Sequence, residues 1–396
     1  MFLDHALPTD DLRTPAAAAK PLRVLILMSR TGGGHLASAR ALEAELQAQR
    51  PGTEVLIVDM LTDYISPPFS LLPKTYDTIV NRAPRLWHAL WRMTAGAKVG
   101  GATTALVSHL SRGRLERLLA TTRPDLVVSV HPLVNHLMLP VLARVSPATR
   151  YVTVVTDLGG IHPLWLHPEN AAVYLPTERA IEVASANGLP RSRLHAHGLP
   201  VRADFASEPG DRAETRRHFG LDPGLPVVLV VGGGGGIGPI EAIVAATADQ
   251  LAAAGGRAAQ IAVVCAKNDR LKADIEGRRW PVPVTALGYV DRMSDLMHAS
   301  DLIVTKAGPG TIAEASIRGL PMAIYGYIPG QEAANVDHVV EAGAGLFEPD
   351  PARLGAEVAR LMTSGAADRS AMATRATALG RAQATHDIVA SILAAH

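Results

Sequence analysis

The sequence predicts an α/β protein with two Rossmann-like, doubly wound domains that face a cleft. Three observations predict this fold. The chain has 396 residues, which is more than one hydrophobic core normally organises. Short apolar, β-branched runs alternate with longer helical patterns, as parallel sheets with crossover helices require. A glycine-rich turn follows the first predicted strand of each half, where Rossmann-like folds place a ligand.

The predicted strands fall into two groups that are separated by residues 198–226, a stretch with prolines, glycines and charges but no strand pattern. The first group lies at residues 24–28, 55–58, 126–130 and 152–155, with an amphipathic helix at 36–49. The second group lies at residues 227–231, 261–265, 284–287, 302–305 and 322–325. Residues 351–395 indicate closing helices. Two such sheets in sequence are the GT-B arrangement.

Whole-chain composition excludes several classes of protein. The net charge is +1, whereas a dedicated nucleic-acid-binding domain is expected to be strongly basic. The single cysteine, Cys265, permits no disulfide framework and indicates a buried strand residue in a reducing compartment. Residues 1–20 lack the basic start and apolar core of a secretory signal, and no stretch is apolar enough to span a bilayer. Any membrane contact is therefore expected to be peripheral.

A strand, a glycine-flanked turn and a helix follow one another at residues 301–314. Free backbone N–H groups and the positive end of the helix dipole would face one pocket there, which suits a diphosphate. We expect the helix to begin near Thr311, so that Glu314 can accept hydrogen bonds from two ribose hydroxyls. Thr311 and Glu314 also match a capping box, and considered singly the capping role would be favoured.

Hydrogen-bonding side chains after the next strand favour the nucleotide interpretation of Glu314. Gln331, Glu332 and Asn335 suit the reading of sugar hydroxyls, although Glu332 equally suits a helix start. The second glycine turn, residues 232–238, contains a G-x-G-x-x-G match that is weak alone. No acid follows the next strand and no Walker A lysine follows either turn, so the turn is expected to cradle a diphosphate or sugar instead.

The first glycine turn ends in Gly33, Gly34 and His35, between a strand and a helix. The glycines allow a substrate to approach the backbone, and the helix N-terminus disfavours a charged imidazole. A neutral histidine can accept a proton from a substrate hydroxyl, so His35 is a candidate general base. The alternative is a solvated N-cap histidine beside a tight turn.

Residues 64–122 carry a local net charge of +6 in a chain whose total is +1. Apolar and aromatic residues are interleaved with the basic ones, which is typical of a surface that docks on anionic membranes. The alternative is a pair of core helices with solvated arginines. We assign to acceptor and membrane contacts Gly33, Gly34, Arg82, Arg85, Trp87, Trp91 and Arg92.

At residues 26–35, 304–314 and 326–332 the chain resembles the monogalactosyldiacylglycerol synthase family and bacterial processive diacylglycerol glucosyltransferases. A more distant similarity reaches the peptidoglycan GlcNAc transferase, which acts on a lipid-linked muramyl peptide. The resemblance implies an inverting transfer of a hexose from a UDP-sugar to a lipid hydroxyl, without metal or cofactor. Plant members tend to have an acid inside the second glycine turn; this chain does not, which leaves the donor sugar open.

The resemblance also implies roles for individual residues. His35 would be the base, Glu314 the ribose ligand, and Gln331 with Asn335 donor-sugar ligands. Independently of the resemblance, Asp157 at the end of the strand predicted at 151–156 is expected to orient His35 or simply to form a turn. The full donor set is Gly233, Gly234, Gly235, Tyr289, Val290, Arg202, Lys306, Gly308, Pro309, Gly310, Thr311, Glu314, Gln331, Glu332 and Asn335.

These assignments predict a disordered tail at residues 1–20, an acceptor and membrane-docking domain at 21–200, a UDP-sugar-binding domain at 201–370 and a closing helix at 371–396. The expected donor is UDP-galactose or UDP-glucose, the acceptor is diacylglycerol, and the expected place is the inner face of the cell membrane, with anionic lipids as partners and no nucleic acid. Two rival classes are a soluble UDP-sugar enzyme, such as a UDP-GlcNAc 2-epimerase, and a nucleotide-sugar-binding protein without catalysis.

Overall fold

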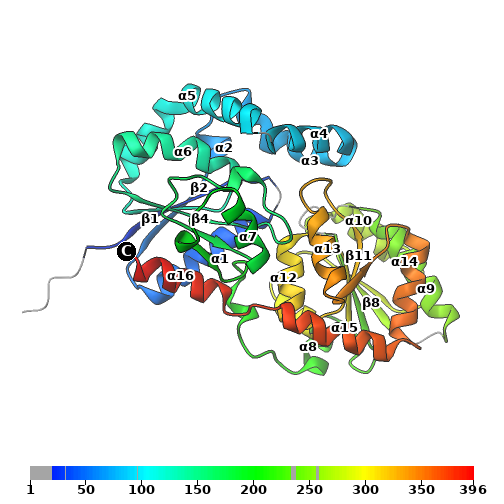
Figure 1. Cartoon of the computed structure of the whole chain (residues 1–396). Coiled ribbons are helices and arrows are strands. Elements are labelled where there is room, and N and C mark those ends of the chain that lie inside the picture. Colours follow the sequence, from blue (N-terminus) through cyan, green and yellow to red (C-terminus); the bar gives the residue numbers. More distant parts are fainter. Residues whose placement is uncertain (1–19, 32, 96, 233–237, 256–257) are drawn as a thin grey trace, which may run out of the picture.

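The structure is a computed structural model that describes residues 20–31, 33–95, 97–232, 238–255 and 258–396. It has two lobes, each with a six-stranded parallel sheet between layers of helices (Figure 1). This confirms the predicted pair of doubly wound α/β domains. The predicted tail lies almost wholly outside the described residues.

The N-terminal lobe has the strand order β2-β1-β3-β4-β5-β6. The strands are β1 (Arg23–Met28), β2 (Glu54–Asp59), β3 (Leu126–Ser129), β4 (Arg150–Val154), β5 (Ala172–Leu175) and β6 (Leu194–Ala196). The helices are α1 (Gly34–Gln49), α2 (Met60–Asp63), α3 (Leu72–Arg82), α4 (Pro84–Ala95), α5 (Ala97–Thr122), α6 (Pro132–Val145) and α7 (Glu178–Ala186). The sequence analysis did not predict β5, which has 4 residues, or β6, whose 3 residues are too few to show a periodic pattern.

The C-terminal lobe has the strand order β12-β11-β10-β7-β8-β9. Its strands are β7 (Val227–Val231), β8 (Gln260–Val264), β9 (Val284–Leu287), β10 (Leu302–Lys306), β11 (Met322–Gly326) and β12 (Gly345–Phe347). Its helices are α8 (Arg212–His218), α9 (Ile240–Ala253), α10 (Asp269–Gly277), α11 (Met293–Ala299), α12 (Pro309–Ile317), α13 (Ala333–Glu341), α14 (Pro351–Met362) and α15 (Ala366–Leu379). The five predicted strands are confirmed to within a residue.

Short 3₁₀ helices connect several of these elements. They are η1 (Phe69–Leu71), η2 (Pro163–Trp165), η3 (Arg191–Arg193) and η4 (Ala203–Phe205). The last helix, α16 (Ala384–Ala394), returns to the N-terminal lobe and packs against α1. The predicted boundary at residue 371 therefore falls inside α15, which packs against α12 in the C-terminal lobe, and only α16 closes the chain on the first lobe.

The chain crosses between the lobes twice, and the two crossings lie side by side. The backbone N–H of Val201 donates to Thr385 Oγ1 at 2.9 Å, while the Thr385 hydroxyl donates back to the Val201 carbonyl at 2.6 Å. Alternate side chains of each central strand enter separate cores. In β7, for example, Val228 and Val230 pack toward α9 and α14, whereas Leu229 packs on the opposite face. Both faces of each sheet are thus covered, as parallel sheets require.

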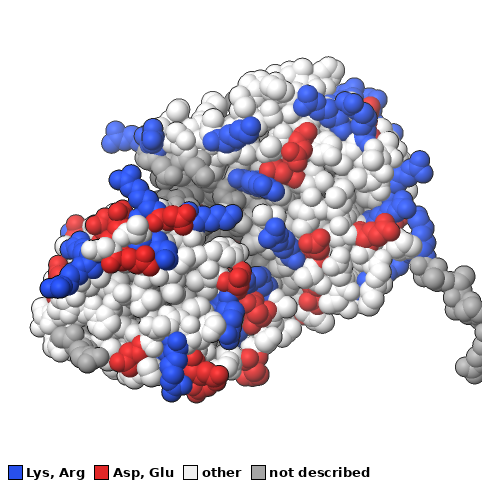
Figure 2. Space-filling model, turned by 180° about the vertical axis from the view of Figure 1, so that it is seen from behind, with Lys and Arg blue, Asp and Glu red and all other residues white. Residues whose placement is uncertain are grey.

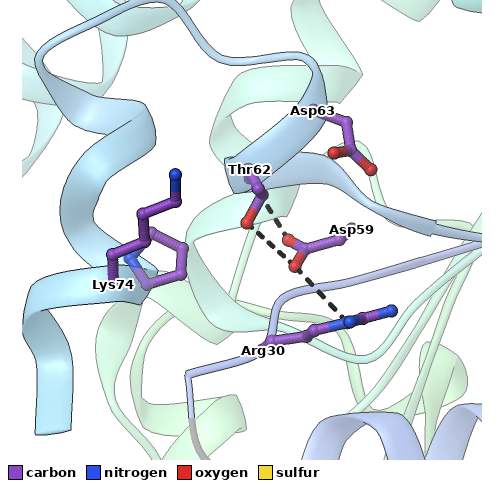
Figure 3. A pocket seen from close by; sticks show the side chains of 6 residues that line it. Arg30, Asp59, Thr62, Asp63 and Lys74 are labelled. Atoms are coloured by element: carbon purple, nitrogen blue, oxygen red, sulfur yellow. Dashed lines mark hydrogen bonds and ion pairs between the residues drawn. The ribbon is translucent and has the colours of Figure 1, made fainter.

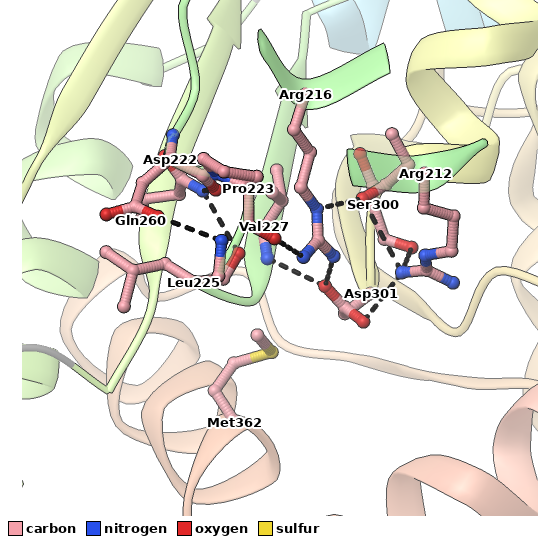
Figure 4. A network of polar contacts seen from close by, with 12 residues as sticks. Arg212, Arg216, Asp222, Pro223, Leu225, Val227, Gln260, Ser300, Asp301 and Met362 are labelled. Carbon is pink, nitrogen blue, oxygen red and sulfur yellow. Dashed lines mark hydrogen bonds and ion pairs between the residues drawn. The ribbon is translucent and has the colours of Figure 1, made fainter. Parts of the chain in front are cut away.

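A network of polar side chains fixes α8 to the amino-terminal ends of β7 and β10 (Figure 4). Asp301 accepts from Arg212 at 2.8 Å, from Arg216 at 2.8 Å and from the Val227 backbone N–H at 2.7 Å. Arg216 also donates to the carbonyl of Ala299 at 2.9 Å. This network lies at the edge of the sheet away from the glycine turns, so its role is to stabilise the lobe.

Replacing Asp301 by Ala should lower the free energy of unfolding by about 2–4 kcal/mol, because it strands the largely buried guanidinium of Arg216 without its carboxylate. Equilibrium urea unfolding measures this loss. Asp274→Ala is the matched control: its pair with Arg270 is exposed, so the change should stay below about 1 kcal/mol. Equal effects of the two substitutions would contradict the structural role of the network.

Candidate active site

His35 is the second residue of α1 and is buried, with 8% of its surface exposed. Burial lowers the pKa of its imidazole to about 4, while a hydrogen bond with the Val130 backbone acts in the opposite direction. The ring is therefore neutral at pH 7, as expected of a base that must accept a proton. No solvated N-cap histidine is observed.

Two residues at the ends of neighbouring strands surround the His35 ring. Thr156 Oγ1 lies 3.0 Å from His35 Nδ1, and the ring of His131 lies 4.7 Å from that of His35 between centroids. His131 Nε2 in turn lies 3.1 Å from Thr31 Oγ1. Burial and the neighbouring His35 lower the pKa of His131 well below its usual value. Two uncharged imidazoles thus lie side by side at the carboxyl edge of the first sheet.

Asp157 is buried, but its carboxylate does not contact His35. Asp157 Oδ2 accepts a hydrogen bond from the indole N–H of Trp165 at 2.6 Å. Burial raises the pKa of Asp157 to about 7, opposed by this hydrogen bond and assisted by the charge of Glu332. The expectation that Asp157 orients His35 is therefore replaced by a direct contact from the preceding residue, Thr156.

The first glycine turn has open space around it. A methyl group built on Gly33 or Gly34 would meet no atom within 4 Å, so the backbone before His35 is accessible to a ligand. Gly233, Gly234 and Gly235 of the second turn lie outside the described residues, and their predicted contacts with a diphosphate or sugar stay a prediction.

The helix α12 begins at Pro309, with Gly308 as its N-cap and no side-chain cap. It therefore starts two residues before the predicted position, and the capping box of Thr311 and Glu314 does not form. The N–H groups of Gly310 and Thr311 have no acceptor within the helix, as expected of a first turn. A methyl group built on Gly310 would meet nothing within 4 Å. An anion can approach this helix end.

Glu314 lies in the second turn of α12, and its carboxylate has no hydrogen-bond or ion-pair partner among the described residues. Although part of the side chain is exposed, desolvation by the surrounding atoms raises its pKa to about 7. The charge of Arg202 opposes this rise and that of Asp204 adds to it. A carboxylate of this kind is available to accept hydrogen bonds from a ligand.

The cations predicted to bind the diphosphate are both paired with carboxylates. Lys306 Nζ is hydrogen-bonded to Glu332, which is 3% exposed and also accepts from the Ile328 N–H at 2.9 Å. Arg202 donates to Asp204 at 2.8 Å and to the Asp291 carbonyl at 2.9 Å. Both carboxylate oxygens of Glu332 thus stabilise the loop that precedes α13. This is the second of the two roles predicted for Glu332, that of a residue at a helix start.

Asn335 joins the two lobes. Its Oδ1 accepts from the backbone N–H of Gly159 at 2.8 Å, and its Nδ2 donates to the Ala307 carbonyl at 2.9 Å. Asn335 has 1% of its surface exposed, and both ends of its amide are hydrogen-bonded. In this structure the residue that was predicted to bind the sugar connects the two lobes.

The remaining predicted donor residues differ in their surroundings. Gln331 Oε1 accepts from the Tyr76 hydroxyl at 2.9 Å, and no described residue pairs with its Nε2. Tyr289 is 66% exposed, and Val290 is partly buried against the core of the C-terminal lobe. Gln331 therefore keeps a donor group that a sugar hydroxyl can use.

The tryptophans predicted to enter the membrane lie instead where α4 meets the other lobe. Figure 1 shows α3 and α4 extending from the first lobe toward the second. Trp87 packs with Tyr76 and Ile328, while a methyl group on Gly330 would lie 2.6 Å from Trp91 Cδ1. Their aromatic faces serve contact between lobes, because the loop before α13 fills the space beside them.

A hollow of about 320 Å³ lies beside the first glycine turn (Figure 3). Its wall includes Arg30, Asp59, Asp63 and Lys74. Asp59 Oδ1 accepts from the N–H of Thr62 at 3.2 Å and so caps α2. The two basic and two acidic side chains balance one another, which does not favour an anionic ligand.

Two family descriptions match the chain: "Monogalactosyldiacylglycerol (MGDG) synthase" over residues 35–201 and "Glycosyltransferase family 28 C-terminal domain" over residues 227–389. The chain is 39% identical to monogalactosyldiacylglycerol synthase 1, chloroplastic, of Arabidopsis thaliana over 378 residues, which cover 94% of this chain and 70% of that protein. It is 40% identical to a probable monogalactosyldiacylglycerol synthase, chloroplastic, of Glycine max, with 93% and 71% covered.

Solved structures share the fold at low sequence identity. MurG of Acinetobacter baumannii superposes with a TM-score of 0.57 at 15% identity, covering 94% of this chain and 99% of that one. UDP-GlcNAc 2-epimerase of Neisseria meningitidis gives a TM-score of 0.59 at 14% identity, covering 94% and 100%. These likenesses show the GT-B fold and do not choose between transferase and epimerase.

The two lobes and the two matched family descriptions define a GT-B glycosyltransferase. The chain belongs to the monogalactosyldiacylglycerol synthase family. The predicted family and enzyme class are thereby confirmed.

Three residues of the site were not predicted from the sequence. Thr156 and His131 are each the second residue after a strand, β4 and β3 respectively, and polar residues at the carboxyl ends of parallel strands are a usable signal for a site. Tyr76 gives no such signal, because its partner Gln331 is 255 positions away in the chain.

Glu314 should make binding of a UDP-sugar depend on pH. As the predicted ribose ligand, Glu314 would accept the ribose hydrogen bonds in its ionised form, so lowering the pH through the pKa of about 7 should weaken binding, by about 10-fold between pH 8 and pH 6. Calorimetry with UDP-galactose and no acceptor measures this. Glu314→Gln should bind more weakly with little pH dependence and without a lower melting temperature. A wild-type affinity that does not change over this range would remove Glu314 from the ribose site.

Proposed function

We propose that this glycosyltransferase moves galactose from UDP-galactose to the free hydroxyl of diacylglycerol, with inversion at the anomeric carbon. The observation that carries the reaction type is the buried, neutral His35 beside an open glycine turn, on the lobe opposite the one that carries Glu314 and the free amides of α12. The relatives' names supply galactose and diacylglycerol, and they favour galactose over the glucose that the sequence left open.

In the proposed reaction His35 takes the proton of the diacylglycerol hydroxyl as that oxygen attacks the anomeric carbon. Thr156 fixes the rotation of the imidazole through Nδ1, so the ring does not have to be ordered when the acceptor arrives. UDP leaves from the opposite face of the sugar. Attack on one face and departure from the other give inversion.

The leaving diphosphate gains negative charge as the bond to the sugar breaks. The first-turn amides of α12 supply hydrogen-bond donors and a positive dipole for it. Lys306 ends β10 just before α12, and the charge of Arg202 acts on Glu314, so both cations can contribute if they exchange their present carboxylate partners. We propose that these groups make a metal ion unnecessary.

The rival 2-epimerase would share the nucleotide site but has no use for a surface that meets lipid. On α4 and α5 exposed apolar side chains lie beside exposed arginines, which supports the proposal of such a surface. Leu86 and Met93 of α4 are 54% and 50% exposed, and Leu106 and Leu110 of α5 are 53% and 52% exposed. Figure 2 shows Lys and Arg side chains scattered over the upper part of the molecule, with uncharged side chains between them. This surface favours the lipid-directed enzyme.

We propose that Arg82, Arg85, Leu86, Arg92 and Met93 dock the enzyme on anionic lipids, a set that we call the α3–α4 docking face. Leu86 and Met93 are one heptad apart and share one side of α4, with Arg85 and Arg92 on its flank. Among the described residues no helix is both long and apolar enough to cross a bilayer. The relatives are chloroplastic by name; for this chain the inner face of the cell membrane stays the prediction from sequence.

Purified protein supplied with UDP-galactose and diacylglycerol vesicles, in the presence of a chelator, should release UDP and form a galactolipid. His35→Ala should lower turnover by roughly 10²-fold or more and leave UDP binding nearly unchanged, because a general base contributes about that factor. His386→Ala, which alters an exposed histidine on α16, is the control and should retain wild-type turnover. Full activity of His35→Ala would exclude it as the base; no transfer by the wild type to diacylglycerol would refute the proposal.

Changing Arg82, Arg85 and Arg92 together to Glu should abolish sedimentation with anionic vesicles, since each basic residue near such a surface contributes about 1 kcal/mol. Wild-type sedimentation should fall as salt is added. In the control variant three exposed arginines of the other lobe, Arg217, Arg270 and Arg279, are changed to Glu, so that the net charge changes by the same amount. If both triple variants lose sedimentation alike, net charge and not the docking face controls binding.

A further inference from the structure

The helices that carry the docking face also contact the loop that carries Gln331. We infer that Tyr76 is a positioning residue for Gln331, and that α3 and α4 couple membrane attachment to recognition of the donor sugar. This inference rests on the proposed function and deepens it, because it assigns a second role to a segment whose proposed task is attachment alone.

The loop over residues 328–332 is held from two sides. On one side Ile328 packs in a small apolar cluster with Tyr76, Val80 and Trp87, and the ring of Trp87 lies 5.1 Å from that of Tyr76, edge to face. On the other side Glu332 binds Lys306 at the end of β10. The loop therefore cannot shift without disturbing α3 and α4 on one side or β10, the strand that precedes α12, on the other.

Gly330 shows how closely α4 approaches this loop. Its φ is +82°, and a methyl group built on it would lie 2.6 Å from Trp91 Cδ1. Trp91 is fixed from behind by His162, whose ring centroid lies 4.3 Å away, and whose Nε2 lies 3.3 Å from the Trp91 carbonyl. Movement of α4 away from the second lobe would thus release the loop, and movement toward it is blocked.

Tyr76 determines which end of the Gln331 amide is available. The phenol O–H donates to Oε1 at 2.9 Å, which directs the amide oxygen toward α3. The Nε2 group, which has no partner among the described residues, is then left to donate to an acceptor such as a sugar hydroxyl oxygen. Without this hydrogen bond the amide can rotate and present either end, so discrimination and affinity for the sugar should both decline.

The helix α4 carries both the proposed lipid contact and the contact with the loop. On α4, Leu86 and Met93 are exposed while Trp87 and Trp91 face the loop, so lipid and loop meet different sides of the same helix. A membrane that restrains α4 therefore restrains the loop as well. Thermodynamic linkage requires that the coupling be reciprocal: the donor sugar should strengthen vesicle binding by the factor by which vesicles strengthen sugar binding.

The test measures affinity for UDP-galactose by calorimetry, without diacylglycerol, with and without vesicles of phosphatidylcholine and phosphatidylglycerol. Wild-type affinity should rise about 3- to 10-fold with vesicles, the range expected of one hydrogen bond and its ordering. Affinity for UDP alone should not rise, because UDP lacks the sugar. Tyr76→Phe keeps the ring packing and should lose the rise. The control, Tyr174→Phe, removes a hydroxyl that is 3.2 Å from Ser391 Oγ, far from the loop in the fold, and should keep it.

Kinetics in detergent solution, with a short-chain diacylglycerol, test the positioning role without a membrane. Tyr76→Phe should raise KM for UDP-galactose about 3- to 10-fold and leave KM for the acceptor unchanged. In a Gln331→Ala background the same substitution should have no further effect, which a purely structural role of Tyr76 would not produce.

Each part of the inference has its own refutation. Vesicle binding by the wild type with no change in affinity for UDP-galactose would overturn the coupling and leave the docking face intact. Absence of vesicle binding would overturn docking and coupling together. Equal losses from Tyr76→Phe in the wild-type and Gln331→Ala backgrounds would overturn the positioning role, while galactolipid formation would still uphold the proposed function.

Discussion

The site depends on one buried amide. Asn335 accepts from Gly159 in the first lobe through Oδ1 and donates to Ala307 in the second through Nδ2. Gly159 lies two residues after Asp157 and three after Thr156, which contacts His35, and Ala307 directly precedes the N-cap of α12. The same side chain therefore fixes His35, the proposed base, and α12, the proposed anion-binding helix, relative to each other. Neither end of a buried amide can lose its partner without an unsatisfied polar group.

The joint also constrains the sequence around it. A methyl group on Gly159 would lie 1.9 Å from the Ala334 carbonyl oxygen, so only glycine permits the backbones of the two lobes to meet there. The two lobes also meet closely at Gly330, where a side chain would collide with Trp91 of α4. Through the contact at Gly330, α4 lies against the loop before α13 of the second lobe, although α4 belongs to the first lobe.

The sequence was sufficient to predict the two sheets and, to within two residues, the start of α12, because apolar strands and a glycine-flanked turn are local signals. It did not reveal the contacts of residues whose partner lies in the other lobe. Asn335 and Gln331 have the chemistry of sugar ligands, and nothing local reveals that Gly159 and Tyr76 engage them. For the same reason the sequence did not reveal that the tryptophans of α4 contact the second lobe: an aromatic side chain suits a lipid surface and a domain contact equally. Short strands such as β6 were missed because they bury too few residues to show a period.

Burial governs the charges of the site as well. It lowers the pKa of His35 to about 4 and raises those of Asp157 and Glu314 to about 7, so the imidazole is neutral and the two carboxyl groups titrate near physiological pH. In the proposed reaction, with His35 as the base on one lobe and the donor sugar on the other, attack and departure take opposite faces of the sugar. The most direct test is the anomeric configuration of the product made from UDP-α-galactose, read by proton NMR. The account predicts a β-linked galactosyl diacylglycerol; an α-linked product would contradict it.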